Sequence, residues 1–170
     1  MMKRMIVVML LLGINIYAGL IEEGVAEARK GKNVEALKLF EQACLEQKVA
    51  QGCYYSAQAY AKGTVVSKDM DKAFDFYTKS CDIGYTAGCM VVGSSYYYGR
   101  SVKKDYNKAE ALFQTACTLG DANGCFLLGS MYDLGQGIKR DVKQAKEFYT
   151  KACDYGSKMA CKYKQQMLNN

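Results

Sequence analysis

The residues best suited to chemistry in this chain are its eight cysteines, which recur at a regular spacing. They are Cys44, Cys53, Cys81, Cys89, Cys117, Cys125, Cys153 and Cys161. The two cysteines of successive pairs lie 9, 8, 8 and 8 positions apart, and the second members follow one another at intervals of 36 residues. Pairs of this kind can form disulfides, bind a metal ion or exchange thiols.

Disulfide formation fits the spacing best, because a repeated structural unit would let each unit close its own bond. The expected pairs are Cys44–Cys53, Cys81–Cys89, Cys117–Cys125 and Cys153–Cys161. Zinc is the competing interpretation, but structural zinc sites use more closely spaced ligand pairs. Thiol exchange is disfavoured because the chain has no C-x-x-C motif. We therefore expect four structural disulfides, no metal and no cofactor.

Other catalytic patterns are scarce. The chain has no histidine, which excludes a Ser-His-Asp triad and histidine-ligated zinc. Ser101 to Lys104 form a literal S-x-x-K motif. In serine β-lactamases that serine opens a helix and the lysine lies one turn later. Here the motif falls in a predicted loop before Asp105, without a K-T-G or S-D-N partner motif, so we interpret it as chance and leave the catalytic residues unassigned.

The start of the chain predicts export. In residues 1–18, Lys3 and Arg4 precede an apolar stretch that is too short to span a bilayer well, and Ala18 is a plausible cleavage point. This pattern predicts a signal peptide, with an uncleaved membrane anchor as the alternative. The whole chain carries +6, and removing those two cations leaves +4. Such a mild excess, in an exported protein, argues against a nucleic-acid partner.

The elements that position the cysteines are helices, arranged in hairpins that repeat every 36 residues. Gly63, Gly99 and Gly135 recur where a first helix would end, as glycine does at helix C-termini. Asp69, Asp105 and Asp141 recur where an N-cap would open a second helix. Apolar residues in each half follow helical spacing, and we expect Tyr60, Tyr96 and Tyr132 to be core residues.

A period of this length is typical of a solenoid, so we predict an all-α array of four helix-hairpin repeats, with nine helices in all. The mature domain would occupy residues 19–170. Its repeats are expected at about residues 19–48, 49–84, 85–120 and 121–156, followed by a polar capping helix at 157–168.

The skeleton resembles the Sel-one-like repeat, a relative of the tetratricopeptide repeat. The pattern G-C-x-x-L-G-x-x-Y-x-x-G is nearly complete from Gly124 to Gly135, and D-x-x-K-A occurs at Asp69 and Asp105. Cysteines at eight-residue spacing make the chain similar to the Helicobacter cysteine-rich protein family, which are secreted and have one disulfide per repeat. That resemblance implies penicillin binding and slow β-lactam hydrolysis.

The scaffold itself predicts a binding protein, because solenoids form extended concave surfaces. The positions two, six and nine after the second cysteine of a pair share one side of the first helix. From these we predict ligand contacts at Tyr55, Lys62, Ser95, Tyr98 and Met131. The expected ligand is a peptide, a protein or cell-wall material bound to a periplasmic or secreted monomer. The alternative is a weak β-lactam hydrolase, with β-lactams as ligands.

Overall fold

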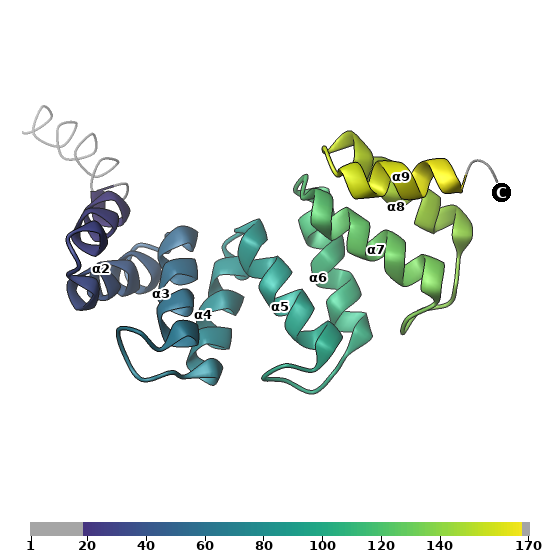
Figure 1. Ribbon diagram of the computed structural model, residues 1–170. Coiled ribbons are helices and arrows are strands. Elements are labelled where there is room, and N and C mark those ends of the chain that lie inside the picture. The colour runs from purple at the N-terminus through teal and green to yellow at the C-terminus, as the bar shows by residue number, and fades with distance from the viewer. Residues whose placement is uncertain (1–18, 168–170) are drawn as a thin grey trace, which may run out of the picture. The chain divides into compact units, whose positions relative to one another are not determined.

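The computed structural model describes residues 19–167, so the expected signal peptide at residues 1–18 lies outside the described range. Within that range the chain forms nine helices and no strand (Figure 1). The first is a helical segment at residues 19–29. The others are α2 (Asn33–Leu45), α3 (Ala50–Lys62), α4 (Met70–Asp82), α5 (Thr86–Tyr98), α6 (Tyr106–Thr118), α7 (Ala122–Leu134), α8 (Val142–Asp154) and α9 (Lys158–Gln166). The all-α prediction is confirmed.

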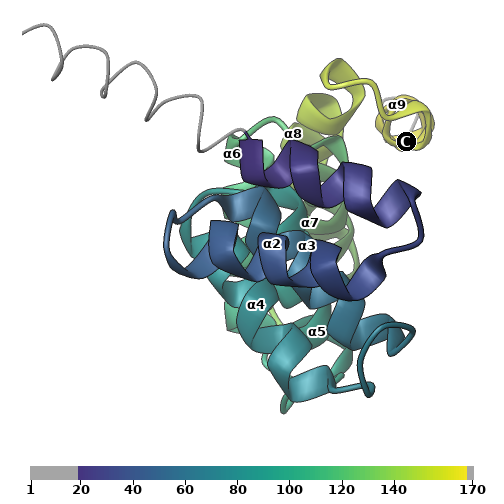
Figure 2. The ribbon, with the colours of Figure 1, turned by 90° about the vertical axis from the view of Figure 1, so that its left-hand side faces the viewer.

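The helices divide into two compact units. Described residues up to Tyr85 form unit 1, and those from Thr86 onward form unit 2. In unit 1 the segment 19–29 lies alongside α2 (Figure 2), and α3 packs against both α2 and α4. In unit 2 each helix from α5 to α9 packs against the next one in sequence. Neighbours in sequence are therefore neighbours in space within each unit, as a repeat array requires.

Aspartate N-caps open the second helix of three hairpins, α4, α6 and α8. The carboxylate of Asp69 accepts a hydrogen bond from the backbone N–H of Lys72, at 2.9 Å, at the start of α4. The same contact recurs at α6 and α8, where the caps are Asp105 and Asp141. Each cap satisfies a backbone donor that has no partner within the helix. The sequence prediction for these three residues is confirmed.

Glycine ends the first helix of the hairpins. Gly63 after α3 and Gly135 after α7 have φ angles of 68° and 65°, in the left-handed region that favours glycine. Gly63 donates its backbone N–H to the carbonyl of Ala59, and Gly135 donates to that of Met131. These contacts occupy carbonyls that the helix leaves open and turn the chain into the inter-helix loop.

Small residues let the two helices of a hairpin approach closely. A Cβ atom added to Gly93 would lie 2.8 Å from the ring of Phe113, and one added to Gly129 would lie 2.7 Å from the ring of Tyr149. Both aromatic rings are buried in the core of unit 2. The glycines therefore provide the space into which the large second-helix side chains pack.

Disulfides join α2 to α3, α6 to α7 and α8 to α9, in each case a second helix to the first helix of the next repeat. Cys44 is bonded to Cys53, Cys117 to Cys125 and Cys153 to Cys161, with Cα–Cα distances of 4.6, 4.6 and 4.7 Å. Cys81 and Cys89 are also disulfide-bonded, so the described residues contain no free cysteine and each repeat has one disulfide. Closing an eight-residue loop stabilises the fold by about 2.5 kcal/mol in the chain-entropy description.

Two of the disulfides, Cys44–Cys53 and Cys117–Cys125, form part of the apolar core, whereas Cys153 and Cys161 are half-buried at its edge. Cys44 and Cys53 are buried in unit 1 with Leu37, Tyr60 and Phe76. In unit 2, the core contains Cys117, Cys125, Phe113, Leu128, Met131 and Tyr149. None of the helices within residues 19–167 is both long enough and apolar enough to cross a membrane.

Candidate ligand-binding surface

Within each unit, the first helices of the hairpins present a surface that is half-buried along the helix and open at its C-terminal end. We call it the first-helix surface and define it by the positions two, six and nine after the second cysteine of each pair. In α3, α5 and α7 these positions hold Tyr55, Ala59 and Lys62, then Val91, Ser95 and Tyr98, then Leu127, Met131 and Leu134. The ninth position is exposed in all three helices.

Tyr98 is the most suitable binding residue on this surface. Its side chain is 55% exposed at the last residue of α5. Its ring packs edge-on against Tyr97, with centroids 4.8 Å apart, and the guanidinium of Arg100 lies 4.9 Å from its ring centroid. These contacts orient the ring without covering it. Tyr98 therefore offers a large apolar area and a hydroxyl group at low entropic cost.

Two of the other predicted contacts on α3 and α5 are less exposed than Tyr98. Tyr55 is half-buried, because its ring packs against Phe40 of α2 at a centroid distance of 4.9 Å. Lys62 is exposed at the end of α3. Ser95 is half-buried and donates its hydroxyl hydrogen to the carbonyl of Val91 at 2.9 Å. These residues remain partly available, so their role in binding stays a prediction.

The prediction for Met131 is wrong. Its side chain is 0% exposed and belongs to the core of unit 2 with Leu128 and Phe113. Helical spacing places it on the same side as Leu134, which is 62% exposed three residues later. The physical reason is that α6 and α8 both pack against α7, and Met131 lies in the core that they form with it. Leu134 is the α7 residue that a ligand can reach.

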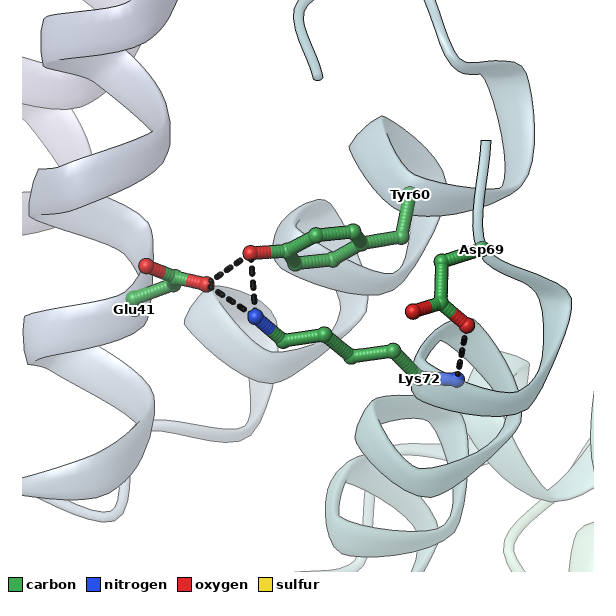
Figure 3. A network of polar contacts seen from close by, with 4 residues as sticks. All are labelled: Glu41, Tyr60, Asp69 and Lys72. Carbon is green, nitrogen blue, oxygen red and sulfur yellow. Dashed lines mark hydrogen bonds and ion pairs between the residues drawn. The ribbon is translucent and has the colours of Figure 1, made fainter. Parts of the chain in front are cut away.

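A polar network ties the end of the first helix to both neighbouring helices in unit 1 (Figure 3). The Tyr60 hydroxyl of α3 donates to the Glu41 carboxylate of α2 at 2.7 Å. Lys72 of α4 donates from Nζ to the same hydroxyl oxygen at 2.5 Å and lies 3.8 Å from Glu41. The backbone N–H of Lys72 also binds Asp69. The network therefore connects α2, α3 and α4 through one tyrosine.

This network does not activate Tyr60 for chemistry. Burial raises the pKa of the Tyr60 hydroxyl, and Glu41 adds to the increase while Lys72 opposes it. The hydrogen bond with Tyr60 raises the pKa of Lys72. At neutral pH the tyrosine is therefore a neutral donor and the lysine a cation, so neither is a base or a nucleophile. With only 9% of Tyr60 exposed, the arrangement is structural, as the sequence predicts.

Unit 2 repeats the arrangement with a different carboxylate. The Tyr132 hydroxyl of α7 donates to Glu110 of α6 at 2.6 Å, and its ring stacks on Phe148 of α8 at a centroid distance of 5.6 Å. The hydrogen bond to Glu110, together with burial, raises the pKa of Tyr132 to about 12. A carboxylate acceptor favours the protonated phenol because ionising it would place two negative charges side by side.

The S-x-x-K motif has no catalytic geometry. Ser101 lies in the loop between α5 and α6, is exposed, and has a φ angle of 61°. Lys104 also lies in this loop, with its Nζ 5.5 Å from the ring centroid of Tyr106. No helix therefore places the lysine one turn after the serine. Within residues 19–167 there is also no group of histidine, cysteine and carboxylate side chains that could hold a metal ion.

The sequence reasoning did not single out a basic cavity in unit 2. It has a volume of about 480 Å³ and is lined by Tyr96, Val102, Lys103, Lys104, Asp105 and Lys108. The signal in the sequence is the pair of basic residues before Asp105 and before Asp141, Lys103-Lys104 and Lys139-Arg140.

Comparison with known proteins gives the family. The model of the Sel1 repeat family matches residues 9–47, 50–85, 86–121 and 122–157. The chain belongs to the Sel1 repeat family. Three of these Sel1 repeats correspond to the helix pairs α3–α4, α5–α6 and α7–α8. Sel1 repeats generally mediate protein interactions. A search of curated proteins gives no match.

Solved structures share the fold. Helicobacter pylori cysteine rich protein B is 30% identical, with a TM-score of 0.59, and the match covers 75% of this chain and 96% of that one. A Sel1 repeat protein from Oxalobacter formigenes is 26% identical, with a TM-score of 0.78 over 88% of this chain and 62% of that one. A protective antigen of uropathogenic Escherichia coli has a TM-score of 0.81 at 23% identity, over 89% of this chain and 33% of that one.

These matches confirm the resemblance to the Helicobacter cysteine-rich proteins and the solenoid fold. The chain spans less than two thirds of the Oxalobacter and Escherichia proteins. Its disulfides, together with the likeness to the Helicobacter protein, indicate that this Sel1 repeat protein is extracytoplasmic, because disulfides persist in oxidising compartments.

Proposed function

We propose that this chain is a periplasmic or secreted repeat scaffold that binds a peptide, a protein segment or a cell-wall fragment on its first-helix surface. The observation that carries the proposal is the exposure of the ninth position in α3, α5 and α7, where Lys62, Tyr98 and Leu134 lie. None of these three residues belongs to the apolar core of either unit.

The residues involved suit recognition. Aromatic side chains carry a large share of the binding energy at many protein interfaces. Tyr98 presents half of its surface and is held by Tyr97 and Arg100, so little side-chain entropy is lost when a ligand covers it. Ser95 would contribute at the edge of the contact in unit 2, and Tyr55 and Lys62 would serve the corresponding surface of unit 1.

The test compares two exposed tyrosines. A displayed library of twelve-residue peptides and a set of peptidoglycan fragments are screened against the oxidised protein, and the ligands selected are measured by calorimetry. Tyr98→Ala is expected to weaken binding at least tenfold, in the range of interface hot spots. Tyr155→Ala is the matched control, because Tyr155 is 50% exposed but lies in a turn beyond α8.

The affinities of the two variants distinguish binding at the first-helix surface from binding elsewhere. Loss of affinity in the Tyr98 variant alone supports binding at the first-helix surface of unit 2. Equal affinity in both variants, or no ligand that saturates the protein, contradicts the proposal. Folding of each variant is checked by circular dichroism, and both substitutions remove an exposed ring, so neither should disturb the core.

A further inference from the structure

The two units differ strongly in charge. Residues 19–85 contain 9 lysines and arginines against 10 aspartates and glutamates, a net charge of −1. Residues 86–170 contain 12 basic against 7 acidic residues, a net charge of +5. Unit 2 therefore carries the whole positive excess of the domain. A single-sign excess of this kind attracts ligands of the opposite charge.

The excess is concentrated in the two loops that join the helices of the hairpins in unit 2. We call this set the basic edge. It consists of Arg100, Lys103, Lys104, Lys139 and Arg140, all exposed. At the corresponding places in the loop of unit 1 the only cation is Lys68. The basic edge is therefore a property of unit 2 and does not follow from the repeat itself.

The two loops of the basic edge lie side by side. The Tyr97 hydroxyl at the end of α5 donates to the side-chain oxygen of Gln136 in the loop after α7. The backbone of Gly137 in that loop lies so close to Tyr106 that an added Cβ would overlap its ring. Both loops are at the lower side of unit 2 in Figure 1. The loop that carries Lys139 and Arg140 therefore lies against the helix ends on either side of the loop that carries Lys103 and Lys104.

Nearby carboxylates neutralise only part of this surface, and Asp105 lies 3.9 Å from Lys108 beside it. Asp105 and Asp141 are N-caps and bind backbone N–H groups at the starts of α6 and α8. Asp133 lies 3.8 Å from Arg140, which also donates to the Asp133 carbonyl. Lys103 and Lys139 have no ion pair within residues 19–167.

The shape of the edge favours a protruding chain over a flat membrane. The 480 Å³ cavity is lined by Lys103, Lys104 and Lys108 and by one carboxylate, Asp105, so its cations outnumber its anions and the recess can receive a further carboxylate side chain. The apolar residues of the two loops, Val102 and Ile138, are half-buried. They supply no apolar anchor, whereas stable attachment to a lipid surface needs one in addition to basic charge.

From this geometry we infer that the basic edge of unit 2 is a second binding surface, which takes an acidic peptide segment of a partner protein. It uses residues other than those of the first-helix surface, and the inference stands whether or not that surface binds a ligand. Carboxylates of the segment would pair with the lysines of both loops, with one side chain seated in the recess.

The test uses a fluorescein-labelled decapeptide of alternating glutamate and serine, and the same peptide with glutamine in place of glutamate. Binding to the oxidised protein is measured by fluorescence anisotropy. The edge variant is Lys103→Glu with Lys139→Glu. The matched control is Lys158→Glu with Lys162→Glu, which makes the same change in net charge at two exposed positions of α9.

We expect the glutamate peptide to bind, the glutamine peptide not to bind, and added salt to weaken the complex. The edge variant should lose at least tenfold in affinity and the control less than twofold. Equal losses in both variants would show an effect of net charge alone and overturn the inference. Absence of binding to the glutamate peptide would also overturn it, as would binding confined to phosphatidylglycerol vesicles. Matched unfolding curves confirm that both variants fold.

Discussion

Replacing Gly124 by alanine has two opposing effects on the stability of the fold. Gly124 lies in the first turn of α7, next to Cys125. Alanine is a better helix former than glycine by about 1 kcal/mol, which alone would stabilise the fold. The added Cβ, however, would lie 2.9 Å from the Cβ of Ala116, 3.0 Å from the backbone nitrogen of Cys117 and 3.1 Å from the carbonyl oxygen of Phe113.

The steric effect should be the larger one. Two of the three close atoms belong to the backbone of α6 and cannot rotate away. The Cys117–Cys125 bond joins the same two helices with a Cα–Cα distance of 4.6 Å, so α7 cannot withdraw freely. Overpacking of this kind costs about 1–3 kcal/mol. We therefore expect Gly124→Ala to lower the free energy of unfolding by about 1 kcal/mol and Tm by about 2–4 °C.

The measurement is urea unfolding of the oxidised protein, followed by circular dichroism at 222 nm. Asn123→Ala is the control, because Asn123 is exposed in the same turn and its replacement changes helix propensity without a new contact. The control should raise the midpoint slightly. If Gly124→Ala raises the midpoint as well, α6 and α7 can separate at little cost, and the argument from close contact is wrong. Ala160 occupies the equivalent place in α9 and is fully buried there. A Cβ atom is therefore accommodated at this position between α8 and α9, and a wider spacing of α6 and α7 is the alternative that the experiment tests.

Two further predictions concern ionisation and catalysis. Tyr132 should titrate near pH 12 in a spectrophotometric titration, and Glu110→Gln should bring its pKa back toward 10. The pKa of Tyr132 in the folded protein is raised above the ordinary value of 10.0. The protonated tyrosine and its hydrogen bond to Glu110 therefore stabilise the fold fully below pH 10, and this stabilisation is lost as the pH rises toward 12. Unfolding midpoints measured across this pH range would reveal the loss. A chromogenic β-lactam should show neither turnover nor a covalent adduct by intact mass, and Ser101→Ala should change nothing. A stoichiometric adduct would instead identify a nucleophile that the loop geometry does not suggest.

Local features of the fold were predictable from sequence because each depends on a few neighbouring residues. Asp69, Asp105 and Asp141 act as caps through contacts only three residues away, and Gly63 and Gly135 adopt the backbone conformation that ends a helix. The repeat spacing extended these local rules to the whole chain, including one disulfide per repeat.

Features that depend on packing between repeats were not predictable. Helical spacing placed Met131 and Leu134 on one side of α7, but only the packed neighbours decide that the first is buried and the second exposed. The contact between Tyr97 and Gln136 joins residues 39 positions apart, and no periodic pattern encodes it. The basic edge therefore became visible only when both loops were placed in space.

The position of the disulfides determines whether the chain stays covalently connected after a protease cuts it. Leu45 and Lys48, both exposed, lie inside the ring that Cys44 and Cys53 close, and the exposed Leu119 and Tyr155 lie inside the rings of unit 2. A peptide bond cut within such a ring leaves the two ends covalently attached, so the protein stays in one piece. Cleavage in these turns therefore does less damage than cleavage in the loops of the basic edge, where the exposed Arg100, Lys103 and Lys139 lie outside these rings.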